Sequence, residues 1–149
     1  MGYTHYWRIK KQYSMPVRAK EIIKEILAEA YKAGIVQYEW NDTKEPLVTD
    51  TVVRFNGVGE NGHETFYFDV TDTYRGSDGQ HFAFCKTARK PYDEVVMKVL
   101  IVLKYFLGDS VIISSHGSFK EEWKNTRDYM LNTFNIRTYV NETLEASQY

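Results

Sequence analysis

A mostly apolar segment from Val95 to Leu107 constrains the fold of this chain more than any other feature. Only Lys98 and Lys104 break it, so a helix of this sequence would be apolar nearly all round, as in a helix buried in a protein core. The segment is too short to cross a lipid bilayer. Pro91 suits the first turn of such a helix, and Gly108 follows its last residue. We therefore expect the rest of the chain to fold around this buried helix.

Two further helices are predicted, one on each side of the central one in the sequence. Ser14 can cap a helix that has Pro16 in its first turn and that Gly34 ends. Its apolar residues recur at helical spacing and are Ala19, Ile22, Ile23, Ile26, Leu27 and Ala30. Ser118 can cap an amphipathic helix whose apolar residues are Phe119, Trp123, Met130 and Phe134. Each of these helices has one face to bury.

The remaining regular structure is predicted to be strands. Alternating or short apolar runs bounded by turn residues occur at Tyr3–Ile9, Ile35–Trp40, Thr51–Asn56, His63–Val70, His81–Thr87 and Val111–Ile113. The middle of the chain is typical of an antiparallel meander. We therefore expect one α+β domain over residues 1–149, with a mostly antiparallel sheet of about five or six strands and three helices packed mainly on one face. The polar end from Ile136 to Tyr149 is expected to fray.

Composition and charge limit the possible functions. The formal net charge is -1, which argues against a general duplex-binding protein that neutralises phosphates over its whole surface. The N-terminus has no basic segment followed by an apolar one, so a cytoplasmic protein without a membrane anchor is expected. Local patches of basic residues remain compatible with binding an anion.

The only cysteine, Cys85, excludes an intramolecular disulfide, and the sequence offers no Cys/His set with the spacing of a structural zinc site. No metal or cofactor is therefore expected. Cys85 could act as a nucleophile with His63 or His81 as its base. Its place in a strand next to Phe84 favours a small core residue instead.

The glycines of Gly57-x-Gly59-x-x-Gly62 match the dinucleotide-binding pattern. That pattern needs a helix after the glycines to receive the pyrophosphate, whereas a strand is predicted to follow here. A hairpin loop is therefore the favoured interpretation.

Two histidines stand in the H-x-[ST] pattern of the two-histidine phosphoesterases, as His63-Glu-Thr65 and His116-Gly-Ser118. In that chemistry the paired histidines act as general acid and base on a phosphodiester. Serine and threonine are common in this chain, so the pattern is only weakly specific.

Four polar residues, Arg54, Asn56, Glu64 and Lys86, stand near the predicted strand ends. Strand alternation places three of them beside apolar neighbours, namely Val52 for Arg54, Phe66 and Phe68 for Glu64, and Phe82 and Phe84 for Lys86. Charged groups on such core-facing rows must be paired or placed in a polar pocket. The two alternatives are an internal ion-pair network and the rim of a binding pocket.

Lys86 and Arg89 lie at the junction between a strand and the central helix, where three cations precede Pro91. The first N–H groups of a helix attract anions, so both side chains could converge on one phosphate or carboxylate. A base could stack beside them on an aromatic ring, for which the candidates are Tyr6, Trp7, Tyr67 and Tyr92.

Several segments resemble a family of small uncharacterised proteins of tailed phages and prophages. These segments are Met1–Trp7 (MGYTHYW), Arg54–Gly57 (RFNG), Gly62–Phe66 (GHETF) and Phe84–Asp93 (FCKTARKPYD). The resemblance covers most of the chain and is less specific in its final third. It implies a phage accessory protein that acts in the host cytosol.

These observations lead to one main hypothesis and two alternatives. The main hypothesis is a protein that binds a small anionic, nucleotide-like ligand, for example a host immune nucleotide signal that it sequesters. The candidate ligand-binding residues are Arg54, Asn56, His63, Glu64, Lys86, Arg89 and Tyr92. One alternative is a small hydrolase in which His63, Glu64 and Lys86 perform acid–base chemistry on a phosphoester or glycosidic bond. The other is a protein inhibitor that caps a host enzyme through exposed aromatic residues.

Overall fold

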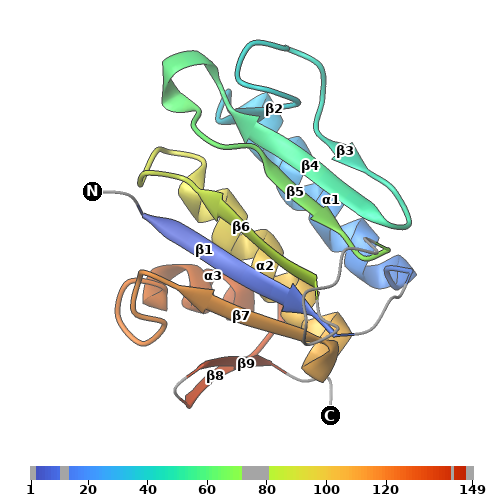
Figure 1. Ribbon diagram of the computed structural model, residues 1–149, viewed down its shortest axis with the longest axis vertical. Coiled ribbons are helices and arrows are strands. Elements are labelled where there is room, and N and C mark those ends of the chain that lie inside the picture. The colour runs from blue at the N-terminus through green and yellow to red at the C-terminus, as the bar shows by residue number, and fades with distance from the viewer. Residues whose placement is uncertain (1–2, 11–13, 72–80, 142, 147–149) are drawn as a thin grey trace.

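A computed structural model describes residues 3–10, 14–71, 81–141 and 143–146 (Figure 1). It has the α+β class predicted from the sequence, with mostly antiparallel strands in several small sheets. The three helices are α1 (Val17–Lys32), α2 (Asp93–Leu107) and α3 (Lys124–Phe134). The strands are β1 (Thr4–Ile9), β2 (Val36–Gln37), β3 (Leu47–Val48), β4 (Val52–Gly57), β5 (Phe66–Asp69), β6 (His81–Lys86), β7 (Val111–Ser115), β8 (Thr138–Asn141) and β9 (Thr143–Ala146).

One sheet has the strand order β6-β1-β7, and both pairings are antiparallel. Its register places Tyr6 of β1 opposite Phe84 of β6 on one side and Ser114 of β7 on the other. Residues directly opposite each other share a face of the sheet. Tyr6, Phe84 and Ser114 therefore form one row across the three strands.

A second sheet has β4 at its centre. β5 pairs with one edge of β4, and the short strands β2 and β3 pair with the other. The loop between β4 and β5 connects two antiparallel strands, which confirms the hairpin predicted for the glycine-rich segment. Gly57 is required there, because a Cβ atom on it would lie 2.4 Å from the carbonyl oxygen of Asn61.

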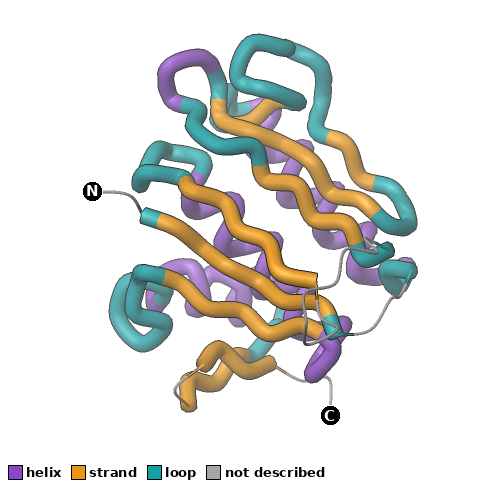
Figure 2. Tube along the Cα trace, viewed as in Figure 1, coloured by secondary structure: helices purple, strands orange, loops and turns teal. Residues whose placement is uncertain are grey.

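The helices α1, α2 and α3 lie on one side of the strands, and in the described part of the chain no helix covers the other side (Figures 1 and 2). The core fills the space between helices and strands. Trp7 of β1 packs against Phe66 and Phe68 of β5, with ring centroids 5.0 and 5.8 Å apart, so the core is continuous behind both sheets. We call the side toward the helices the covered face and the opposite side the open face.

α2 is the central buried helix that the apolar segment predicts. Its buried residues include Val96, Leu100 and Leu103, which are 0% exposed. The helix begins at Asp93, two residues after Pro91. Its last residue is Leu107, and the C-cap Gly108 has a φ of 57°. Even Lys104 is only 3% exposed, because its ammonium group donates hydrogen bonds to the carbonyl oxygens of Gly108 and Val111.

The expectation for the faces of β6 is wrong. Phe84 is 52% exposed, whereas Cys85 is 0% exposed, so the row that holds Phe84 and Lys86 lies on the open face. Cys85 lies on the covered face beside the fully buried ring of Tyr92, and strand alternation therefore directs its neighbours Phe84 and Lys86 to the open face. Cys85 is therefore the core residue that one sequence interpretation favoured.

Three details at the helix ends and the C-terminus also differ from expectation. Pro16 rather than Ser14 is the N-cap of α1, and α3 begins at Lys124, after a turned segment that follows Ser118. The end predicted to fray contains the β8–β9 hairpin, in which Leu144 is 0% exposed. Burial of this one leucine gives the hairpin a hydrophobic anchor that the polar composition hides.

Candidate functional site

The end of β6 meets the segment before β5. The Glu64 amide donates a hydrogen bond to the Lys86 carbonyl oxygen (3.2 Å), and the Glu64 carboxylate accepts one from the Lys86 amide (2.8 Å). The Lys86 carbonyl oxygen also accepts a hydrogen bond from Nδ1 of His63 (2.9 Å), which fixes a proton on that ring nitrogen. The hydroxyl of Tyr92 donates to the Glu64 carbonyl oxygen (2.5 Å). His63, Glu64, Lys86 and Tyr92 are thus brought together.

Tyr92 cannot contact a ligand in this arrangement, because it is 0% exposed. Burial raises the pKa of its hydroxyl far above the ordinary value, so it acts as a neutral hydrogen-bond donor. Trp7, another candidate for stacking a base, is 1% exposed and lies in the core. Both were candidates because sequence alternation does not show which aromatic rings are covered.

Asn56 is also buried, at 0% exposure, and holds the β4–β5 loop. Its amide nitrogen donates to the His63 carbonyl oxygen (2.9 Å), and its amide oxygen accepts from the His63 amide (3.1 Å). The Asn56 side chain thus bonds both backbone groups of His63, at a point where β4 and β5 no longer pair with each other. Asn56 therefore positions His63 and is too deeply buried to bind a ligand directly.

Arg54 forms the internal ion pair that one of the two sequence alternatives described. Its guanidinium lies 3.0 Å from the Glu39 carboxylate and 4.6 Å from the centre of the Tyr38 ring. Burial acts to raise the pKa of Glu39, but hydrogen bonds from Thr65, Arg54 and Asn56 outweigh it and lower the pKa. This network fastens the segment around Glu39 to the hairpin.

Arg89 and Lys86 do not share an anion. Arg89 pairs with Glu122 at 2.7 Å and lies 3.9 Å from the centre of the Tyr3 ring. It sits in a tight turn closed by a hydrogen bond from the Lys90 amide to the Thr87 carbonyl oxygen (3.0 Å), and Ala88 and Arg89 both have positive φ angles, of 53° and 58°. The Arg89 side chain is thus held by Glu122 and Tyr3, and no contact joins it to Lys86 among the described residues.

A buried polar network, which no sequence pattern indicated, lies behind the same strand ends. His5 is 0% exposed and contacts the Asp93 carboxylate through Nε2 (2.7 Å) and the Ser115 hydroxyl through Nδ1 (2.8 Å). Thr87 donates a further hydrogen bond to Asp93 (2.5 Å). The carboxylate thereby joins the first turn of α2 to β1 and to the end of β6.

The order Asp93, His5, Ser115 is that of a catalytic triad, but the serine is not presented as a nucleophile. Its oxygen accepts hydrogen bonds from the Gly117 amide (2.9 Å) and the Trp123 indole N–H (3.3 Å), which occupy its two lone pairs. The network is therefore a structural clamp between β1, β7 and α2.

The open face of the β6-β1-β7 sheet carries a row of aromatic side chains. The rings of Tyr6 and Phe84 lie 6.3 Å apart, and the Tyr6 hydroxyl hydrogen-bonds Nε2 of His116 (2.9 Å). We call these three residues the aromatic row. Lys86 lies beyond Phe84 on the same face, and Arg8 lies beyond Tyr6. The three strands themselves contain no Asp or Glu, and the Glu64 carboxylate lies at the Lys86 amide beside the end of β6.

Sequence reasoning included Tyr6 and Lys86 as site candidates, placed Phe84 in the core, and put Arg8 on the same strand face as Tyr6 without naming it as a site residue. The available signal was the spacing of Tyr6 and Arg8, which alternate with the apolar Trp7 and Ile9. Tyr67 is 44% exposed on β5, which contacts β6. It is the second predicted stacking residue that remains accessible.

His63 and His116 lie on opposite sides of two strands. His63 contacts Lys86, Lys86 pairs with Thr4 of β1, and the His116 amide bonds the Thr4 carbonyl oxygen. Three strand spacings separate them by roughly 14 Å. The two H-x-[ST] segments therefore do not meet around one phosphodiester in this structure.

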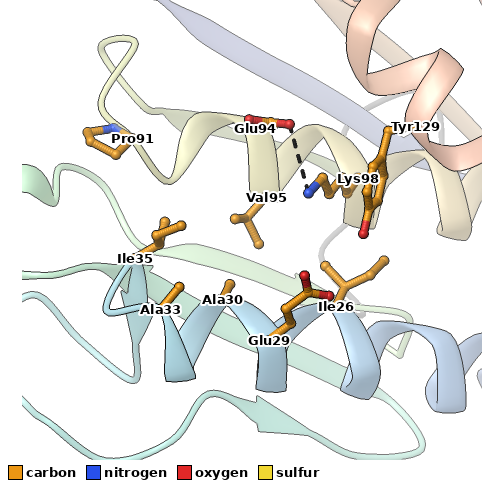
Figure 3. Close-up of a pocket in the computed structure, with 10 residues that line it drawn as sticks. All are labelled: Ile26, Glu29, Ala30, Ala33, Ile35, Pro91, Glu94, Val95, Lys98 and Tyr129. Carbon is orange, nitrogen blue, oxygen red and sulfur yellow. Dashed lines mark ion pairs between the residues drawn. The ribbon is translucent and has the colours of Figure 1, made fainter. Parts of the chain in front are cut away.

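A small cavity lies on the opposite side of the molecule, between α1 and α2 (Figure 3). Its volume is about 110 Å³. Lys98 reaches across it between Glu94 (3.8 Å) and the ring of Tyr129 (4.0 Å). The cavity volume is below the roughly 300–1,000 Å³ of typical ligand pockets, so the cavity is small for a nucleotide.

Within the residues that the structure describes, no cluster of three or more His, Cys, Asp or Glu side chains is arranged to hold a metal ion. None of the helices in that part of the chain combines the length and the hydrophobicity that crossing a membrane requires. No protein-family model, curated protein or solved structure matches the chain.

Proposed function

We propose that the protein binds a small anionic, nucleotide-like ligand on the open face of the β6-β1-β7 sheet. The observation that carries this proposal is the aromatic row beside two cations on strands that contain no acidic residue. In the proposed complex a base lies against Tyr6 and Phe84. The phosphate lies toward Lys86 and His63, at the end of β6.

The chemistry of the face suits such a ligand. Every nucleobase has an apolar face that stacks on an aromatic ring, and each such contact contributes about 1–3 kcal/mol. Phe84 is 52% exposed, so this stacking surface is available without a rearrangement of the core. The Lys86 ammonium group is a donor of charge-assisted hydrogen bonds to phosphate oxygens.

The phage setting of this proposal rests on the resemblance of the sequence segments, and several of these segments meet in the fold. Segments around Tyr3, His63 and Lys86, which are far apart in the sequence, are joined by hydrogen bonds at the end of β6. Sequestration of a host immune nucleotide signal is the biological role that we propose for this site. Such a role requires binding without turnover.

Binding is tested by measuring the melting temperature with cyclic dinucleotides, ADP-ribose derivatives and mononucleotides. We expect at least one of them to raise it, and Phe84→Ala or Lys86→Ala to abolish the increase. Tyr139→Ala and Lys120→Ala are matched controls, because Tyr139 is 55% exposed on the β8–β9 hairpin and Lys120 is exposed before α3. Flat melting curves across the whole panel would contradict the proposal.

The hydrolase alternative is separated from binding by recovering the ligand. In this structure the Glu64 carboxylate is occupied by the Lys86 amide, and the His63 Nδ1 proton by the Lys86 carbonyl oxygen. We therefore expect chromatography after prolonged incubation to return the ligand chemically intact. Steady product formation that His63→Ala abolishes would favour the hydrolase.

A further inference from the structure

We infer that the open face binds linear single-stranded nucleic acid longer than a dinucleotide, an inference that rests on the proposed function and specifies its ligand class. It depends on the spacing between the two cations of the face. Lys86 pairs with Thr4, and Arg8 pairs with Phe82, so the two cations stand four residues apart along antiparallel strands. At about 3.4 Å per residue this offset is about 14 Å.

The aromatic row lies midway between these cations. Tyr6 and Phe84 face each other across β1 and β6, two residues from Arg8 and from Lys86. A mononucleotide stacked on this pair reaches one cation with its phosphate and leaves the other uncontacted. In a longer linear chain, two consecutive bases lie one on each ring, and the phosphates on the outer sides of these two nucleotides lie toward the two cations.

The arrangement selects single strands over duplexes. In a duplex the bases are stacked on one another, so they cannot lie against Tyr6 and Phe84. The chain as a whole has a net charge of -1, which gives little attraction for the duplex backbone away from this face. Single strands expose their bases, and an aromatic platform with flanking cations binds them with little regard to sequence.

Competition binding tests the length dependence. A fluorescein-labelled uridine octanucleotide is bound to the full chain, and its anisotropy is followed while UMP, the dinucleotide, the tetranucleotide or a cyclic dinucleotide displaces it. We expect the tetranucleotide to compete at least tenfold more tightly than UMP, which is about 1.4 kcal/mol. Equal affinities for UMP and the tetranucleotide, or tighter binding of the cyclic dinucleotide, would overturn this inference and leave the proposed function standing.

The substitution Arg8→Gln tests the contribution of Arg8 apart from that of Lys86. We expect this substitution to weaken tetranucleotide binding about tenfold and to change UMP binding less than twofold. A plot of the logarithm of the tetranucleotide association constant against the logarithm of the salt concentration should become less steep by about 0.7. Arg137→Gln, which changes an exposed arginine after α3, is the matched control. An equal loss for UMP and the tetranucleotide would overturn the assignment of Arg8 to the second phosphate. No displacement or binding by any nucleotide would overturn both the inference and the proposed function.

Discussion

The two faces of the β6-β1-β7 sheet use the same strands for different purposes. On the covered face, Trp7 and Cys85 are at most 1% exposed, whereas on the open face Phe84 is 52% exposed. The larger apolar residue of β6 is thus the exposed one. The difference teaches that the buried face of a strand is the one that contacts neighbouring elements, here Cys85 beside the ring of Tyr92, and not the one with the larger apolar residues. A large apolar side chain left on the open face is then a candidate for ligand contact.

The largest expected effect contrasts neighbouring residues of β1. Trp7→Ala removes a buried ring that packs on Phe66 and Phe68, and we expect it to lower the free energy of unfolding by about 3–5 kcal/mol. Tyr6→Ala, on the open face, should lower it by about 1 kcal/mol or less. Urea denaturation of both variants measures the difference. Similar losses for the two would show that the faces do not differ as described.

The next effect concerns the buried clamp. Asp93→Ala leaves His5, which is 0% exposed, without its carboxylate, and we expect a loss of about 3 kcal/mol in the free energy of unfolding. Ser114→Ala, on the exposed side of β7, is the control and should change stability by less than about 0.5 kcal/mol. A stable Asp93→Ala protein would mean that the clamp is dispensable.

A smaller effect follows from the titration of Cys85. Burial raises the pKa of its thiol from 9.0 to about 12. The unfolded chain therefore releases this proton first, so the stabilisation is complete below pH 9 and falls as the pH rises toward 12. At pH 10 the loss from this group is about 1.4 kcal/mol.

Urea denaturation at pH 8 and pH 10 measures this loss. Tyr3 contributes a further loss of stability at higher pH, because burial raises the pKa of its hydroxyl from 10.0 to about 12. Cys85→Ala should remove the part of the decline that begins near pH 9. A decline of unchanged size in that variant would assign it to other groups.

Sequence patterns were sufficient for the parts of the fold that depend on local chemistry. The apolar run predicted α2, and the glycine-rich segment between two strands predicted the β4–β5 hairpin. The short strand β3 was not predicted, because Leu47 and Val48 carry too little periodicity to indicate pairing with β4.

The candidate site was only partly predictable. His63, Glu64 and Lys86 were expected together and do meet. Arg89 was expected beside Lys86, but the turn at positive φ directs it to Tyr3 and Glu122, and backbone conformation of non-glycine residues is not visible in the sequence. The open-face position of Phe84 depends on the packing of Tyr92, which is a tertiary effect.

The most direct test of the central claim is to observe which aromatic rings respond to a ligand. Proton–carbon NMR spectra of the aromatic side chains are recorded with saturating ADP-ribose, a cyclic dinucleotide or a uridine tetranucleotide. We expect at least one ligand to shift the resonances of Tyr6 and Phe84 and to leave those of the buried Trp7 nearly unchanged. Shifts confined to Tyr129, beside the cavity between α1 and α2, or no shifts with any of the three ligands, would contradict the account.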